Sequence, residues 1–298
     1  MARPESIRVF APAKLNLFLH VGAKRADGFH ALESFVVFAE CGDRLTFAPS
    51  DVLELKVTGL FAKSLPAFPD NLVLKAAHLL EDGRGATITL EKNLPVASGL
   101  GGGSADAAAA LRGLNLLWEL NKSEEELMEI GARLGSDVPV CVVSSPAFVE
   151  GRGDVITKAP RVATLPLILV NPNVMLSTVD VFGRLKARSG IGQSVRQPAS
   201  LEKLWDVAAY LQGTQNDLEE PACELAPAID EVMDALLAEG AEIAQMSGSG
   251  ATCFGIFSWR GFALSAAEAL AHEHHNWWVR ATRIAEPGIG QPQWNGDR

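Results

Sequence analysis

Apolar and polar side chains alternate along the first strand-like segment of the chain, which runs from residue 8 to residue 20. Successive side chains of a β-strand point to opposite faces, so a two-residue period sorts this segment into two faces. One face carries the apolar residues Ala13, Leu15, Leu17 and Leu19. The other face carries Lys14, Asn16, Phe18 and His20. A lysine in such a strand is either part of a solvated face or a functional cation, and the pattern leaves both open.

The rest of the chain mixes the strand period with the helical period. Further strands are expected over residues 31–39, 44–47, 86–92, 163–170, 241–245, 252–257 and 278–284, with a turn at 41–43. Helices are expected from about residue 70 to Gly83, and over 104–117, 123–134, 200–211, 228–238 and 262–272. Asp70 or Asn71 can cap the first helix, and Ser123 opens a capping box with Glu126. Strands and helices in both halves predict an α+β protein with about two domains.

Composition narrows the functional classes. Hydrophobic residues make up 48% of the 298 residues, which is enough for a large core. The formal net charge of −10 and the pI near 5.1 argue against a nucleic-acid-binding surface, but not against a small phosphorylated ligand. The N-terminus lacks the apolar segment of a signal peptide, and no apolar run approaches membrane-spanning length. With four widely spaced cysteines that form no CxxC pair, these features predict a cytoplasmic protein with reduced thiols and no membrane partner.

A glycine-rich loop lies between the strand expected at 86–92 and the helix expected from Ser104. It contains Gly99, Gly101, Gly102 and Gly103. Glycine lets backbone N–H groups approach a ligand closely, and a helix N-terminus adds unpaired donors and the positive end of the helix dipole. The order strand, glycine loop, helix therefore predicts a phosphate cradle, with a tight turn that binds no ligand as the alternative. The loop is not a Walker A sequence, because no Gly-Lys-Ser/Thr follows.

Phosphoryl transfer also needs a group that activates the acceptor and a cation that balances charge. Asp137 lies between a helix end and an apolar run and is the candidate for the first task, with capping of a turn as its alternative. Lys14 is the candidate cation. A second glycine-rich loop at 247–251 could close over the same polyphosphate or simply form a hairpin turn. The run from His272 to His275 lies near the end of an amphipathic helix and is interpreted as solvated rather than as a metal site.

Three segments together resemble the signature motifs of the GHMP kinase superfamily, in the same order and at matching distances. They are Pro12-Ala-Lys-Leu-Asn-Leu17, the loop from Pro95 to Ser104, and Ser247-Gly-Ser-Gly-Ala251. Within the superfamily, residues 12–30, 70–72, 135–140 and 216–219 resemble kinases that act on a cytidine-diphosphate sugar alcohol in non-mevalonate isoprenoid biosynthesis. The resemblance implies a ribosomal-protein-S5-like N-terminal domain, a ferredoxin-like C-terminal domain and an active site between them. The expected boundaries are 1–158 for the ATP-binding domain, 159–286 for the second domain and 287–298 for a disordered tail.

The resemblance also implies the residues of the site. The catalytic pair is Lys14 and Asp137. ATP is expected to contact Asn71, Leu72, Lys92, Pro95, Val96, Ala97, Ser98, Gly99, Leu100, Gly101, Gly102, Gly103, Ser104 and Ala105. The cytidine substrate is expected to contact Asn16, Phe29, His30 and Phe182. Ser104 is the expected Mg²⁺ ligand, with the phosphates of ATP supplying most of the others. The family often has a hydroxylated aromatic where this chain has Phe29, so ring stacking is expected without a hydroxyl hydrogen bond.

These features predict an ATP- and Mg²⁺-dependent kinase that phosphorylates the 2-hydroxyl of the sugar alcohol, with small molecules as its partners. Another small-alcohol kinase of the superfamily is the nearest rival, and the segments 28–30 and 135–140 argue against it. A catalytically silent sensor or a nucleotide-binding structural protein would also contain a phosphate-binding loop. The presence of both Lys14 and Asp137 argues against the sensor, and the second glycine-rich loop argues against the structural protein. Both a monomer and a weak homodimer fit the sequence.

Overall fold

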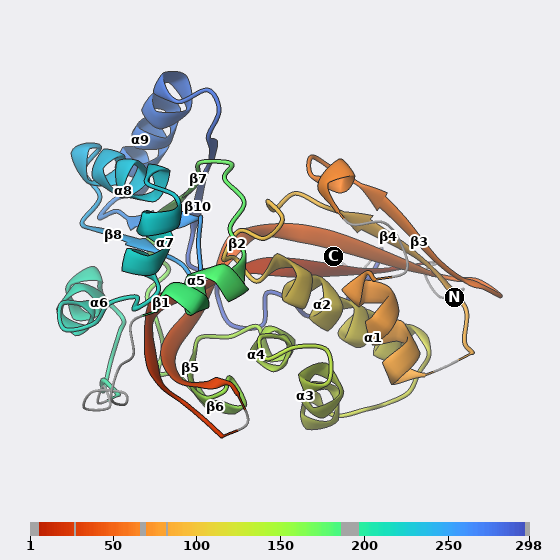
Figure 1. The fold of residues 1–298 in the computed structure, drawn as a ribbon. Helices are drawn as coiled ribbons and strands as arrows, with labels where there is room; N and C mark the ends of the chain where they lie inside the picture. The colour runs from red at the N-terminus through yellow and green to blue at the C-terminus, as the bar shows by residue number, and fades with distance from the viewer. Residues whose placement is uncertain (1–5, 27, 66–69, 82, 186–196, 296–298) are drawn as a thin grey trace.

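The computed structural model describes residues 6–26, 28–65, 70–81, 83–185 and 197–295, and it contains two β-sheets (Figure 1). The larger sheet has the strand order β11-β1-β2-β4-β3, and β5 and β6 continue it from the other end of β2. Its strands are β1 (Ile7–Lys24), β2 (His30–Pro49), β3 (Leu53–Thr58), β4 (Ala86–Glu91), β5 (Ala147–Gly151), β6 (Val155–Lys158) and β11 (Gln293–Trp294). Apart from the parallel pair β3–β4, its neighbouring strands are antiparallel.

Helices pack on one face of the larger sheet and bury an alanine-rich core beneath them (Figure 1). They are α1 (Leu72–Leu80), α2 (Gly102–Leu117), α3 (Glu124–Ala132) and α4 (Val138–Val143). The short 3-10 turn η1 (Ala62–Ser64) follows β3 and buries none of its own residues. The small side chains of α2 let this helix lie close to β1 and β2, so its N-terminus comes near the middle of β1. That approach positions the glycine-rich loop.

The second sheet has the order β10-β7-β9-β8, and its neighbouring strands are antiparallel. It is built from β7 (Pro166–Asn171), β8 (Ile243–Met246), β9 (Cys253–Ile256) and β10 (Trp278–Arg283). The helices that accompany it are α5 (Thr178–Arg184), α6 (Leu204–Leu211), α7 (Glu219–Leu225), α8 (Ala228–Ala238) and α9 (Arg260–Glu273). The two sheets meet where the Ala285 amide donates to the Phe38 carbonyl at 2.7 Å and Ala39 pairs with Ile284. The division of the chain after residue 158 stays a prediction.

Two of the predicted helix starts are confirmed, and the matching ends come earlier than predicted. The Asn71 side chain accepts from the Val73 amide and caps α1, and Ser123 and Glu126 form the full capping box of α3. The first helix ends at Leu80 rather than at Gly83, and α3 ends at Ala132 rather than near residue 134. Helix caps are therefore stronger signals here than the glycines that follow the helices.

The turn predicted at 41–43 is wrong, because β2 runs as one strand from His30 to Pro49. Gly42 lies opposite Pro12 of β1, and a Cβ built on it would lie 2.2 Å from the Ala11 carbonyl oxygen. This glycine permits a close approach of two strands instead of reversing the chain.

The sorting of β1 into two faces by a two-residue period is also wrong after Asn16. The pairing of β1 with β2 shifts between Asn16 and Phe18, as in a β-bulge. As a result Phe18 is fully buried in the core with Leu15 and Leu17, and Leu19 joins Lys14 and Asn16 on the wall of a cavity.

The sequence predicts a disordered tail from residue 287, but the structure describes a defined conformation for residues 287–295. Gln293 and Trp294 form β11, which pairs with the start of β1. Most of the polar connection predicted at 188–198 lies outside the described residues. None of the helices in the described part of the chain has the length and apolar character that a membrane crossing requires.

The four cysteines are free, as predicted. Cys141 and Cys253 are buried, and burial raises the pKa of the Cys141 thiol to about 12.

Candidate active site

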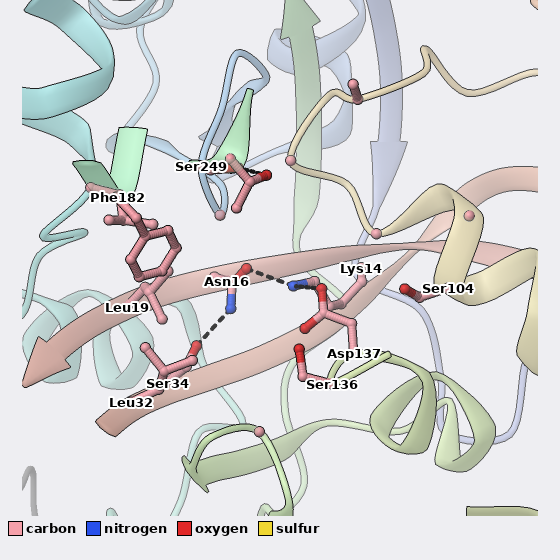
Figure 2. Close-up of a pocket in the computed structure, with 18 of the residues that line it drawn as sticks. Lys14, Asn16, Leu19, Leu32, Ser34, Ser104, Ser136, Asp137, Phe182 and Ser249 are labelled. Atoms are coloured by element: carbon pink, nitrogen blue, oxygen red, sulfur yellow. Dashed lines mark hydrogen bonds and ion pairs between the residues drawn. The ribbon is translucent and has the colours of Figure 1, made fainter. Parts of the chain in front are cut away.

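A cavity of about 830 Å³ lies where β1, β2, the glycine-rich loop, the start of α4 and helix α5 meet. Figure 2 shows Phe182 and Ser104 on opposite sides of the Lys14–Asp137 pair. Nucleotide-loop residues line one end and aromatic residues line the other, so two ligands can meet over that pair. This is the size and shape that a two-substrate site requires.

Lys14 and Asp137 form the centre of this cavity. The Lys14 Nζ atom lies 3.0 Å from Asp137 Oδ2, although 123 residues separate the two in sequence. Lys14 is only 3% exposed, so the interpretation of its strand face as solvated is wrong. Asp137 precedes α4 but makes no side-chain capping hydrogen bond, so the alternative that it merely caps a turn is also wrong. Its side chain is 46% exposed, which leaves a carboxylate open to the cavity.

Asn16 holds the other side of the lysine ammonium group. Its Oδ1 atom accepts from Lys14 Nζ at 2.9 Å, and its Nδ2 donates to Ser34 Oγ at 2.7 Å. The backbone amide of Asn16 donates to Ser247 Oγ at 3.2 Å, which ties β1 to the second glycine-rich loop. Asn16 lines the cavity as predicted, but its amide group is engaged first in holding Lys14. Contact with substrate stays a prediction.

The two glycine-rich loops pack directly against each other. Ser247 Oγ donates to the Gly99 carbonyl at 3.1 Å, and the Thr252 amide donates to the Ser98 carbonyl at 3.0 Å. Gly99 has φ +79°, and a Cβ on it would lie 2.2 Å from the Ser247 carbonyl oxygen. Only glycine fits this backbone and this contact.

The first loop leads into the N-terminus of α2, which begins at Gly102. The predicted ATP residues that line the cavity are Leu72, Lys92, Pro95, Val96, Ala97, Ser98, Gly99, Gly101, Gly102, Gly103 and Ser104. The cavity lining does not include Asn71, which caps α1, or Leu100 and Ala105, which are buried in the core. Helix α2 is sixteen residues long, and its N-terminus opens on the cavity. Such a helix N-terminus is suited to bind phosphate.

Lys92 has a different environment from the one sequence reasoning suggested. Its Nζ atom lies 2.5 Å from Asp43 Oδ2 and 2.7 Å from Asp106 Oδ2, and all three residues are buried. Burial opposes the charged ammonium, but Asp106 and Asp43 outweigh that effect and raise the pKa of Lys92. Burial also opposes the charged form of Asp106 and raises the pKa of that carboxyl to about 7, against the lowering effect of Lys92.

This buried ion network supports the phosphate loop from behind. Asp43 Oδ1 also accepts from the backbone amides of Asn93 and Leu94, at 2.5 and 2.9 Å. A Cβ on Gly102 would lie 3.0 Å from Lys92 Nζ. The sequence analysis missed Asp43 and Asp106, and the only available signal was an acidic residue in a helix of alanines.

The aromatic end of the cavity gathers the three residues predicted for the cytidine base. The rings of His30 and Phe182 lie 5.5 Å apart with a 38° tilt, and Phe29 is 54% exposed beside them. The His30 Nδ1 atom lies 2.9 Å from the Gly22 carbonyl, which fixes the ring orientation. The Arg152 guanidinium lies over the Phe29 ring at 5.9 Å, and sequence reasoning missed it.

The donor set for a divalent metal ion is small. Ser104 lines the cavity, and Figure 2 shows it on the far side of Asp137 from Phe182. Within the described ranges, no group of three or more histidine, cysteine or acidic side chains could hold a metal, and this includes the histidines at 272–275. Binding of Mg²⁺ at Ser104 stays a prediction, in which the phosphates of ATP would supply most of the ligands.

Comparison with known proteins agrees with this geometry. The family model described as the GHMP kinases N terminal domain matches residues 71–145, and the GHMP kinases C terminal model matches residues 199–278. The chain is 48% identical to the 4-diphosphocytidyl-2-C-methyl-D-erythritol kinase of Parvibaculum lavamentivorans, over 91% of this chain and 96% of that protein. It is 45% identical to the enzyme of that name from Rhizobium etli, over 94% of this chain and 95% of that protein.

A solved structure of a 4-(cytidine 5'-diphospho)-2C-methyl-D-erythritol kinase is also similar. It has a TM-score of 0.73 and 30% identity, over 93% of this chain and 99% of that chain. The two sheets and the paired glycine-rich loops define an α+β kinase of the GHMP class. Within that class, the chain belongs to the family of 4-diphosphocytidyl-2-C-methyl-D-erythritol kinases.

Proposed function

We propose that the protein transfers the γ-phosphate of ATP to the 2-hydroxyl of 4-diphosphocytidyl-2-C-methyl-D-erythritol, in the methylerythritol phosphate pathway of isoprenoid synthesis. The observation that carries this proposal is the position of the Lys14–Asp137 pair, between a phosphate-binding loop and an aromatic pocket. The identity of the relatives supports the choice of substrate over other alcohols.

The pair divides the chemistry between its two members. Lys14 holds Asp137 Oδ2 at 3.0 Å, which leaves Oδ1 to accept the proton of the substrate hydroxyl. The hydroxyl oxygen attacks the γ-phosphorus, its proton passes to Asp137, and the bond to the β–γ bridging oxygen breaks to release ADP. The positive charge of Lys14 orients the carboxylate and balances negative charge on the transferred group. Loop amides and the N-terminus of α2 hold the phosphates in line.

Mg²⁺ would neutralise charge on the β- and γ-phosphates, with the Ser104 hydroxyl as its protein ligand. The lysine and the loop amides act on the same phosphates from the protein side. The metal is expected to enter together with ATP, because the phosphates of ATP would supply most of its ligands.

His30→Ala is expected to raise the KM for the cytidine substrate on the order of tenfold to a hundredfold while leaving the KM for ATP unchanged. The His30 ring lies against Phe182 at the end of the cavity remote from the glycine-rich loop, so its loss removes base contacts alone. Steady-state kinetics with each substrate varied in turn checks this. His275→Ala changes an exposed histidine outside the cavity and is the matched control. An equal rise in both KM values would refute the assignment of this end to cytidine.

A further inference from the structure

Ser34 lies behind the catalytic pair and is part of a continuous chain of buried hydrogen bonds. Its hydroxyl lies 2.6 Å from the Phe18 carbonyl oxygen and 2.7 Å from the side-chain amide of Asn16. The other side-chain atom of Asn16 lies 2.9 Å from Lys14 Nζ. Lys14, Asn16 and Ser34 are 3%, 5% and 3% exposed. Figure 2 shows the chain running from Ser34 through Asn16 to Lys14 and Asp137.

The protons of this chain can be placed by elimination. Two oxygens 2.6 Å apart need a proton between them, and the Phe18 carbonyl has none, so the Ser34 hydroxyl must donate to it. With its one proton used, Ser34 Oγ can only accept from Asn16. The Asn16 atom that faces Ser34 is therefore the NH₂ group, and the atom that faces Lys14 is the carbonyl oxygen.

The opposite orientation of the Asn16 amide would be costly. It would place an NH₂ group against the Lys14 ammonium, so that two donors would face each other in a buried site. The ammonium would then lose one of the two protein acceptors that hold it in place. The shift in strand pairing after Asn16 belongs to the same arrangement, because it pairs Leu19 with Ser34 and brings the Phe18 carbonyl within reach.

We infer that Ser34 is a positioning residue for phosphoryl transfer, which fixes the orientation of the Asn16 amide and, through it, the Lys14 ammonium against Asp137. This inference rests on the proposed function, since it assigns Ser34 to the same reaction. Ser34 acts through Asn16 and not on the substrates, so its loss affects the chemical step more than the binding of either ligand.

Ser34→Ala is expected to lower kcat about tenfold, the ratio that corresponds to one net hydrogen bond, with both KM values little changed. Ser34→Thr keeps the hydroxyl, and its extra methyl can point into the cavity that Ser34 lines, so it is expected to restore kcat. Ser144→Ala is the matched control for stability, because the buried Ser144 hydroxyl also donates to a backbone carbonyl at 2.6 Å. It is expected to leave kcat unchanged. If Ser34→Ala does not fold, Ser34→Cys keeps the volume with a weaker hydrogen-bonding group.

A double-mutant cycle distinguishes positioning from a general structural role. If Ser34 acts through Asn16, then adding Ser34→Ala to Asn16→Ala is expected to cause no further loss of kcat. A second loss of about tenfold in the Asn16→Ala background would overturn the inference, as would unchanged kcat in a folded Ser34→Ala protein. Failure of the proposed function would be detected in a separate measurement, in which the wild-type protein phosphorylates a different alcohol. The cycle can then be run with that alcohol.

Discussion

Asp137→Asn is expected to lower kcat by ~10²–10⁴-fold, the usual contribution of a general base. Asparagine keeps the shape of the side chain and an oxygen that can accept from Lys14, so the local geometry is preserved. The amide cannot take a proton from the substrate hydroxyl, and the loss therefore falls on the chemical step. ADP release at saturating ATP and substrate measures it, and thermal unfolding shows that the fold is retained.

Glu54→Gln is a suitable control for Asp137→Asn. Glu54 also makes an ion pair with a lysine, Lys56, at 3.2 Å, but it lies on β3 outside the cavity. Its amide variant is expected to keep wild-type kcat. An Asp137→Asn protein with more than about a tenth of wild-type kcat would exclude Asp137 as the base.

Lys14→Met is expected to lower kcat by ~10²–10³-fold, the range seen when one stabilising donor is removed from a transition state. Methionine preserves the straight side chain that packs beside Gly101, so the change is mainly the loss of positive charge. Lys14→Arg is expected not to restore activity. The ammonium lies between Asn16 Oδ1 at 2.9 Å and Asp137 Oδ2 at 3.0 Å, and a longer, planar guanidinium cannot take the same position.

We expect the effects of changing Lys14 and Asp137 on kcat to be non-additive, because the two residues act together. In the double variant Lys14→Met/Asp137→Asn, the loss of kcat is expected to be close to that of the more severe single variant. Lys56→Met removes a lysine of an exposed ion pair and is the control for loss of positive charge. Losses that multiply in the double variant would show that the two residues act independently.

Local signals in the sequence predicted much of the framework. The order of strand, glycine loop and helix is confirmed by β4, the loop and α2, because glycines and a following alanine run act locally. The caps at Asn71 and Ser123 were predictable for the same reason. Helix α4 is not predicted by the sequence pattern, because Pro139 interrupts a short apolar run. Proline is in fact compatible with the first turn of a helix, where its missing N–H costs nothing.

Individual residues of the site were predictable from the sequence, but their arrangement was not. From the residues alone, Lys14 could equally have been solvated and Asp137 could have been a turn cap. Their pairing depends on contacts across 123 residues, which no local period reports. The family resemblance supplied that pairing in advance. The ion network of Lys92 with Asp43 and Asp106 had no motif at all, and Gly42 gave a turn signal in a continuous strand.

The most direct test of the account is ADP release by the full chain with ATP, Mg²⁺ and one alcohol at a time. The alcohols are 4-diphosphocytidyl-2-C-methyl-D-erythritol and, separately, mevalonate, homoserine and galactose. We expect turnover with the cytidine compound alone, and loss of that turnover in Asp137→Asn. Turnover with another alcohol would contradict the cytidine pocket, and ATP binding without turnover of any alcohol would contradict the assignment as a kinase.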